Sequence, residues 1–149
     1  MGKERKAIKE MNTLIEKYPD NSRYKAILAG IYIENGEDEK AEKIYNKLEN
    51  AGRLDGRILL SISEFYRKNA DYDKAYNYLK KAFAAKDLNV DMKVDMLVGM
   101  ITNSGNSQFE ISKQKELFKI FLNAHPGEPK ALTVYSDFLV KIEENDKAI

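Results

Sequence analysis

The sequence predicts an all-α fold organised in repeats. Apolar residues recur at helical spacing, as Ala41, Tyr45 and Leu48 do, which is the pattern of an amphipathic helix. No stretch alternates between apolar and polar residues with the period of two that indicates a strand. The same residue types also return at a fixed interval along the chain, which predicts that the helices form repeating units.

The repeat interval is 34 residues. Ala7, Ala41 and Ala75 are spaced at this interval (41 − 7 = 34 and 75 − 41 = 34), and so are Tyr32 and Tyr66 (66 − 32 = 34). Short strings of one form accompany these positions: EDEKA at 37–41, DYDKA at 71–75 and ENDKA at 144–148. Spacing and residue class therefore agree.

The last part of the chain is displaced by five residues. Ala148 follows Ala75 by 73 residues (148 − 75 = 73), five more than two repeats, and Pro126 follows Pro19 by 107 (126 − 19 = 107), five more than three. Both offsets place one five-residue insertion between Ala75 and Pro126. The insertion either lengthens the helix after Ser107 by a turn or forms a loop at Ser104–Ser107.

In chain order, the first predicted helix covers about 3–18 and carries Ile8, Met11 and Ile15 on one face. A pair of helices at 22–35 and 38–50 follows, and the Asn-Gly dipeptide at 35–36 ends the first of them. The next pair covers 56–69 and 71–85, and Asp71 is the expected N-cap of its second helix.

The third pair is predicted at 90–103 and 107–124. Ser107 and Glu110 match a capping box, which favours the lengthened helix over the loop. The last helix covers 129–143 and begins at Pro129, because proline is tolerated in a first turn. The string at 144–148 is expected to start a further helix.

These helices predict one domain over 1–149. The segment 3–18 is the second helix of an incomplete repeat, three repeats cover 22–55, 56–89 and 90–126, and 129–149 is a second incomplete repeat. Because solenoids need polar terminal caps, we expect a fragment of a longer array. Its terminal helices are then candidates for self-association into a homo-oligomer.

The period and the residue classes resemble the tetratricopeptide repeat (TPR) family over 3–149. The copy that starts at Ser22 matches the family pattern with Leu28-Ala29, Tyr32, Gly36, Ala41, Tyr45 and Leu48. The sequence departs from the pattern in having no Trp, in placing Lys25 at the first large position, and in replacing an Ala by Gln114. The resemblance implies an α–α superhelix, a right-handed solenoid of antiparallel helix pairs.

The resemblance also implies a concave groove lined by the first helix of each repeat. The matching positions are Arg23, Ala26, Ile27, Gly30 and Glu34; Arg57, Leu60, Ser61, Glu64, Arg67 and Lys68; Asp91, Val94, Asp95 and Val98; and Lys130, Thr133, Val134, Asp137 and Lys141. The expected floor is apolar (Ile27, Leu60, Val94, Val98 and Val134), with mixed charge around it. Such a groove suits a peptide segment with aliphatic anchors; the alternative is an ordinary solvated face.

One subtype of the family is disfavoured by its residues. Chaperone-binding members hold a peptide's terminal carboxylate with Lys, Asn and Arg. The matching positions here are Ala26, Gly30, Ser61, Asp91 and Asp95, and the two carboxylates would repel that ligand. Asp91 and Asp95 alone make a poor cation site, so a solvated face is the better interpretation of this pair.

Composition excludes several other function classes. The 25 basic and 24 acidic residues nearly cancel, and Asp91, Asp95 and Asp137 interrupt the basic row that a nucleic-acid-reading repeat needs. No apolar run approaches the roughly 18 residues of a membrane span. There is no Cys, and the single histidine, His125, lies at a helix end, where a cation suits the helix dipole. We expect no enzyme activity, cofactor or metal site.

The leading hypothesis is a non-catalytic scaffold that binds a protein or peptide. Two alternatives stay open: a structural segment of a longer repeat array that mediates assembly, and a non-catalytic part of a larger regulator. The identity of the partner and the cellular compartment stay undetermined by the sequence.

Overall fold

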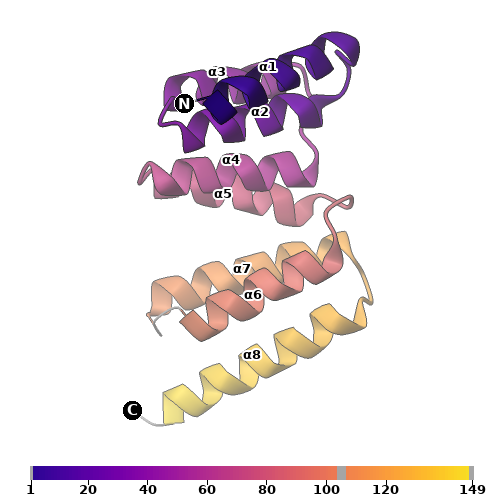
Figure 1. Cartoon of the computed structure of the whole chain (residues 1–149). Coiled ribbons are helices and arrows are strands. Elements are labelled where there is room, and N and C mark those ends of the chain that lie inside the picture. Colours follow the sequence, from indigo (N-terminus) through magenta and orange to yellow (C-terminus); the bar gives the residue numbers. More distant parts are fainter. Residues whose placement is uncertain (1, 104–106, 148–149) are drawn as a thin grey trace. The chain divides into compact units, whose positions relative to one another are not determined.

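The chain folds into α-helices joined by short turns (Figure 1). The computed structural model describes residues 2–103 and 107–147. Within these ranges the helices are α1 (Gly2–Lys17), α2 (Ser22–Glu34), α3 (Asp38–Asn50), α4 (Gly56–Lys68), α5 (Tyr72–Ala84), α6 (Val90–Asn103), α7 (Gln108–Ala124) and α8 (Pro129–Lys147). No strand occurs in the described ranges, so the all-α class is confirmed.

The last helix differs from its prediction, while the other seven lie within a residue of theirs. Helix α8 runs to Lys147, where a break near 143 and a new helix were predicted. The two earlier turns of this kind place Gly36 (φ 74°) and Ala70 (φ 58°) in the left-handed region. Glu143 stands at the equivalent position. A left-handed backbone costs free energy for Glu as it does for Ala70, and here the chain avoids this cost by continuing the helix. Ala148 lies outside the described residues.

The five-residue insertion is largely helical. Helix α7 has 17 residues, against 13 in each of α3 and α5. It begins with the predicted capping box: the Ser107 hydroxyl accepts from the Glu110 amide at 3.2 Å, and the Glu110 carboxylate accepts from the Ser107 amide at 3.4 Å. Residues 104–106 lie outside the described residues.

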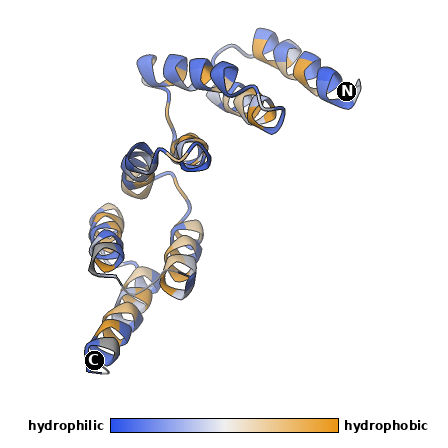
Figure 2. Cartoon of the chain, turned by 90° about the vertical axis from the view of Figure 1, so that its left-hand side faces the viewer, coloured by the Kyte–Doolittle hydropathy of each residue, from blue (hydrophilic) through white to orange (hydrophobic). Residues whose placement is uncertain are grey.

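The chain divides into two compact units, Met1–Leu79 and Lys80–Ile149. The helices carry hydrophobic and hydrophilic residues on different sides (Figure 2). In unit 1 the buried core consists of Ala29, Ala41, Tyr45, Leu48, Ile58, Ile62, Phe65, Tyr66 and Ala75. Ala29 and Ala41 are fully buried, and their small side chains let α2 and α3 approach closely.

Aromatic packing in the core explains three of the tyrosines of unit 1, Tyr45, Tyr66 and Tyr78. Tyr45 and Tyr66 are buried, as the repeat pattern predicted. Tyr78, which the sequence leaves unplaced, stacks on Tyr66 with ring centroids 5.6 Å apart and donates its hydroxyl to Glu49 at 2.6 Å. Burial raises the pKa of Tyr45 to about 12. These rings therefore serve the core rather than a stacking surface for nucleic acid.

In unit 2 phenylalanines fill the core. Phe83 and Phe121 meet edge to face with centroids 6.2 Å apart, and Phe118 stacks on Phe138 at 5.1 Å. Gln114, which departs from the small residue of the repeat pattern, is buried and donates to the Met100 carbonyl at 3.4 Å. The hydrogen bond satisfies a side chain that would otherwise be costly to bury.

Candidate functional site

A hollow of about 580 Å³ lies between α2 and α4 in unit 1. Ten of the predicted groove residues line it: Arg23, Ala26, Ile27, Gly30, Glu34, Arg57, Leu60, Ser61, Glu64 and Lys68. Its remaining lining comes from Ile33, Tyr45, Ile58 and Phe65. The sequence analysis did not assign these four to the groove. Tyr45 matched a repeat position of the following helix, α3, and the packing of α2, α3 and α4 brings all four to the hollow.

Several lining residues of the hollow are small. They are Ala26, Gly30 and Ser61. Glycine inside a helix costs about 1 kcal/mol relative to alanine, yet no tight packing requires it at Gly30, where an added Cβ would meet no atom within 4 Å. The beginning of a side chain at this position would stand in open space. Ile27 stands beside it, 51% exposed, so apolar surface remains available to a ligand.

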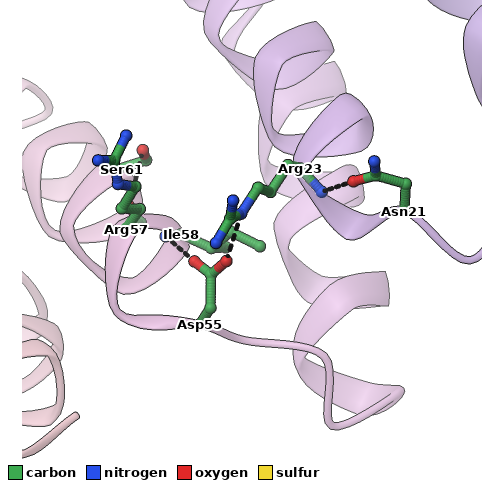
Figure 3. Close-up of polar contacts among 6 residues, drawn as sticks. All are labelled: Asn21, Arg23, Asp55, Arg57, Ile58 and Ser61. Carbon is green, nitrogen blue, oxygen red and sulfur yellow. Dashed lines mark hydrogen bonds and ion pairs between the residues drawn. The ribbon is translucent and has the colours of Figure 1, made fainter. Parts of the chain in front are cut away.

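One end of the hollow is held by a polar network (Figure 3). The Asp55 carboxylate caps α4 by accepting from the Ile58 amide at 2.9 Å, and it accepts from Arg23 Nε at 2.9 Å. The Asn21 side chain caps α2 by accepting from the Arg23 amide at 3.1 Å. Partial burial alone would raise the pKa of Asp55, but the Ile58 amide and the Arg23 guanidinium outweigh it and lower the pKa.

Arg57 is the second arginine at this end. It is exposed, and its guanidinium makes no ion pair or hydrogen bond within residues 2–103 and 107–147. Figure 3 shows it on the side of α4 that carries Ser61, with no contact drawn to Asp55. An exposed arginine without a partner offers up to five donors in a planar fork that matches a carboxylate.

The opposite end of the hollow has mixed charge. Arg67 lies outside the lining and binds Glu64 through two hydrogen bonds of 2.8 and 2.5 Å. The Arg67 hydrogen bonds lower the pKa of Glu64. Glu34 and Lys68 complete this end and are exposed. The hollow therefore runs from an arginine end to an end where the two carboxylates, Glu34 and Glu64, lie together with the cations Lys68 and Arg67.

In unit 2 the predicted groove positions lie on α6 and α8. Asp91 and Lys130 bind each other in an ion pair. Asp91 therefore already has a cationic partner, in agreement with the view that Asp91 and Asp95 make a poor cation site. Lys141 donates to the Ile101 carbonyl. The other positions divide by exposure: Asp95, Val98, Thr133 and Asp137 are exposed, while Val94 and Val134 are half-buried.

His125 differs from its sequence interpretation as a cation at a helix end. It caps α7, but its Nε2 lies 2.7 Å from Lys93 Nζ, and its ring meets Phe121 edge to face. Partial burial and the nearby Lys93 amine lower the pKa of His125. The neutral imidazole is therefore favoured, because a second positive charge beside a lysine is repelled.

Lys93 is a residue that the sequence analysis missed. Its side chain is fully buried, and its amine donates to the Ala85 carbonyl at 2.7 Å. A signal was present, since Lys25 lies two repeats earlier (93 − 25 = 68) and likewise departs from the large residue expected there. Lys25 donates to the Pro19 carbonyl at 3.0 Å. Both amines cover the chain where the preceding helix ends.

The described part of the chain offers little for metal or membrane chemistry. No three or more His, Cys, Asp or Glu side chains gather into a possible metal site among these residues. None of the described helices combines the length and the apolar character needed to cross a bilayer.

One comparison with known proteins identifies relatives. A family model described as the Psidin N-terminal TPR repeats region matches residues 1–136. No curated protein and no solved structure gives a significant match. The matched range covers most of the chain and includes α1 to α7 together with the start of α8.

Proposed function

Because this chain belongs to the Psidin N-terminal TPR repeat family, we propose that it is a scaffold that binds a segment of a partner protein in the hollow between α2 and α4. TPR regions are helical-repeat scaffolds that commonly serve protein interaction. The observation that carries the proposal is the open space at Gly30, in a hollow whose lining is largely apolar.

A site of this kind contributes a modest binding free energy, and its polar groups determine which segment it accepts. Burying one aliphatic side chain of a partner in the hollow contributes about 1.5–3 kcal/mol. Arg57 at one end and the mixed charges of Glu34, Glu64 and Lys68 at the other orient the segment, as polar groups do around an apolar centre. No group in the hollow is arranged as a nucleophile with its base, so binding without catalysis is the function that these residues support best.

The test is selection of binders from a displayed library of random peptides of about twelve residues. The wild-type chain is compared with Gly30→Met, whose side chain fills the hollow, and with Gly30→Ala. The alanine variant is the matched control, because it adds one methyl group and raises helix propensity by about 1 kcal/mol. Thermal melts followed by helical circular dichroism check that both variants fold.

We expect peptides that bind the wild type and Gly30→Ala but not Gly30→Met. If the selected peptides bind Gly30→Met as tightly as the wild type, or if no peptide is enriched, the hollow is not the binding site. The predicted groove positions of unit 2 stay a separate prediction, which alanine substitution of Val98 tests with the same peptides.

A second candidate function is assembly through α8. Leu132, Leu139 and Val140 are exposed on this helix, with Val140 at 54%, whereas Ile8, Met11 and Ile15 of α1 are half-buried. Self-association is therefore better supported at α8 than at α1. Light scattering over a range of concentrations tests it: a dimer that Val140→Glu converts to a monomer supports assembly, and a monomer at every concentration contradicts it.

A further inference from the structure

The arginine end of the hollow is built from one repeat position. Arg23 and Arg57 are 34 residues apart (57 − 23 = 34), and each is the second residue of its helix. Neither first turn contains an acidic residue. A helix N-terminus carries a partial positive charge and favours anions, so two arginines here oppose the usual preference. Asp55 caps α4 and offsets the charge of Arg23, so the net positive charge at this end is that of Arg57 together with the two helix ends.

The same repeat position is neutralised in unit 2. There Asp91 and Lys130 bind each other. In unit 1 both residues at this position, Arg23 and Arg57, are cations, so they cannot pair with each other. Arg23 pairs with Asp55, whereas Arg57 makes no ion pair within the described residues. Unit 1 therefore keeps at this position a positive charge that unit 2 cancels internally.

We propose that the segment bound in the α2–α4 hollow carries an acidic side chain that pairs with Arg57 and an aliphatic side chain that fills the space at Gly30. This inference rests on the proposed function and adds the chemistry of the partner. The charges of the hollow favour this partner, because an Asp or Glu side chain satisfies the free guanidinium fork of Arg57. At the far end the carboxylate of Glu64 is already bound by Arg67.

The positions along the helices set the spacing between these two side chains. Gly30 lies seven residues beyond Arg23, the repeat equivalent of Arg57, which corresponds to about 10.5 Å along the helix. A helical side chain leans toward the helix N-terminus, which adds to the distance between the Arg57 guanidinium and the space at Gly30. In an extended chain, residues i and i+4 point to the same side and lie about 13 Å apart. The partner is accordingly an extended segment with its acid four residues from its aliphatic anchor, and the acid lies toward the N-terminal ends of α2 and α4.

The probe is a set of matched synthetic peptides. The parent is acetyl-Ser-Gly-Asp-Ala-Gly-Ala-Leu-Gly-Ser-amide. Two variants place Asn or Lys at the Asp position, and a third, acetyl-Ser-Gly-Asn-Ala-Gly-Ala-Leu, ends in a free carboxylate. Each is titrated into the full chain while the backbone amide signals of Gly30 and Ser61 are followed by NMR. We expect the Asp peptide to bind at least about fivefold more tightly than the Asn peptide, and the preference to weaken with salt.

Two variants of the chain sharpen the test. Arg57→Glu should reverse the order, so that the Lys peptide binds more tightly than the Asp peptide. Its fold is not at risk, because an acidic residue in a first turn is favourable. Arg53→Glu is the matched control: it makes the same change of charge in unit 1 at an exposed arginine outside the hollow, and it should keep the preference for the Asp peptide.

The outcomes separate this inference from the proposed function. Equal binding of the Asp and Asn peptides at Gly30 and Ser61 overturns the inference and leaves the groove function standing. Tightest binding by the free-carboxylate peptide overturns the assignment to a side chain. If no peptide shifts these two signals, the inference fails, and the groove function fails with it only if the library selection also yields no binder blocked by Gly30→Met.

Discussion

Lys25 in unit 1 and Lys93 in unit 2 occupy one repeat position and make one kind of contact, yet their surroundings differ. Each amine donates to a main-chain carbonyl at the end of the preceding helix. Lys25 is half-buried, whereas Lys93 has no exposed surface and its amine lies beside His125 and 5.5 Å from the centroid of the Phe121 ring. The comparison indicates that the repeat position determines which hydrogen bond the lysine makes. The packing of the neighbouring helices determines how much free energy the burial of its amine costs.

Substitution of each lysine by alanine should reveal this difference with the largest expected change in the free energy of unfolding. Lys93→Ala removes a buried side chain and leaves the Ala85 carbonyl unsatisfied, which costs about 2–4 kcal/mol of the free energy of unfolding. Lys25→Ala exposes its partner to water and should cost less than about 1 kcal/mol. Urea unfolding followed by helical circular dichroism measures both.

A third variant separates packing from charge at the same site. Lys93→Met keeps the volume and removes the buried amine, so its effect should stay within about 1 kcal/mol of wild type. A loss as large as that of Lys93→Ala would show that the hydrogen bond to Ala85, rather than the filling of space, holds the side chain in place.

The two units should also differ in how their stability depends on pH, and Lys93 determines the behaviour of unit 2. Burial lowers the pKa of Lys93 to about 8, with Asp87 opposing the shift. Between about pH 8 and the ordinary lysine value of 10.5, the unfolded chain binds more protons than the folded one, so stability rises with pH. The rise is of order 1–3 kcal/mol, and below pH 8 the charge penalty is fully present.

The opposite sign applies in unit 1 at higher pH. Tyr45 has its pKa raised to about 12 by burial, from an ordinary 10.0, so above about pH 10 the unfolded chain loses its phenolic proton first and stability falls. Urea titrations from about pH 7 to 11 should therefore show a rise and then a decline. Lys93→Met should abolish the rise and keep the decline, and Lys25→Met should alter neither.

The helix pattern was predictable from the sequence, whereas the differences between the units were not. The 34-residue spacing placed seven helices to within a residue, and several boundaries also carry a local signal, such as the Ser107 capping box. The burial of Lys93, the Asp91–Lys130 pair and the open space at Gly30 depend on distances between helices. Those distances follow from packing, which a single chain's residue spacing does not encode.

The turns between helices allow a further, smaller test. Gly36 and Ala70 occupy the same repeat position and both have positive φ, while the equivalent Glu143 of unit 2 lies inside α8. Gly36→Ala should cost about 1 kcal/mol, since a left-handed backbone is strained for a residue with a Cβ. Ala70→Gly should relieve that strain, although the added flexibility of the unfolded chain offsets part of the gain. Thermal unfolding measures both, and destabilisation by Ala70→Gly would contradict the strain at this turn.

The smallest expected effect comes from giving unit 2 the charge arrangement of unit 1. Asp91→Arg breaks the exposed ion pair with Lys130 and replaces an anion in the first turn of α6 by a cation. An exposed pair contributes little to stability, and the first turn of α6 also loses a favourable interaction with the helix dipole. Urea unfolding should therefore show a small loss of stability, below that caused by Gly36→Ala. The reciprocal Arg57→Asp in unit 1 should gain stability for the same reason, because it puts an anion at the N-terminus of α4. If both substitutions instead destabilise the chain equally, Arg57 contributes to the stability of unit 1. Its presence would then be explained without a ligand, and the proposed pairing with an acidic side chain would lose its support.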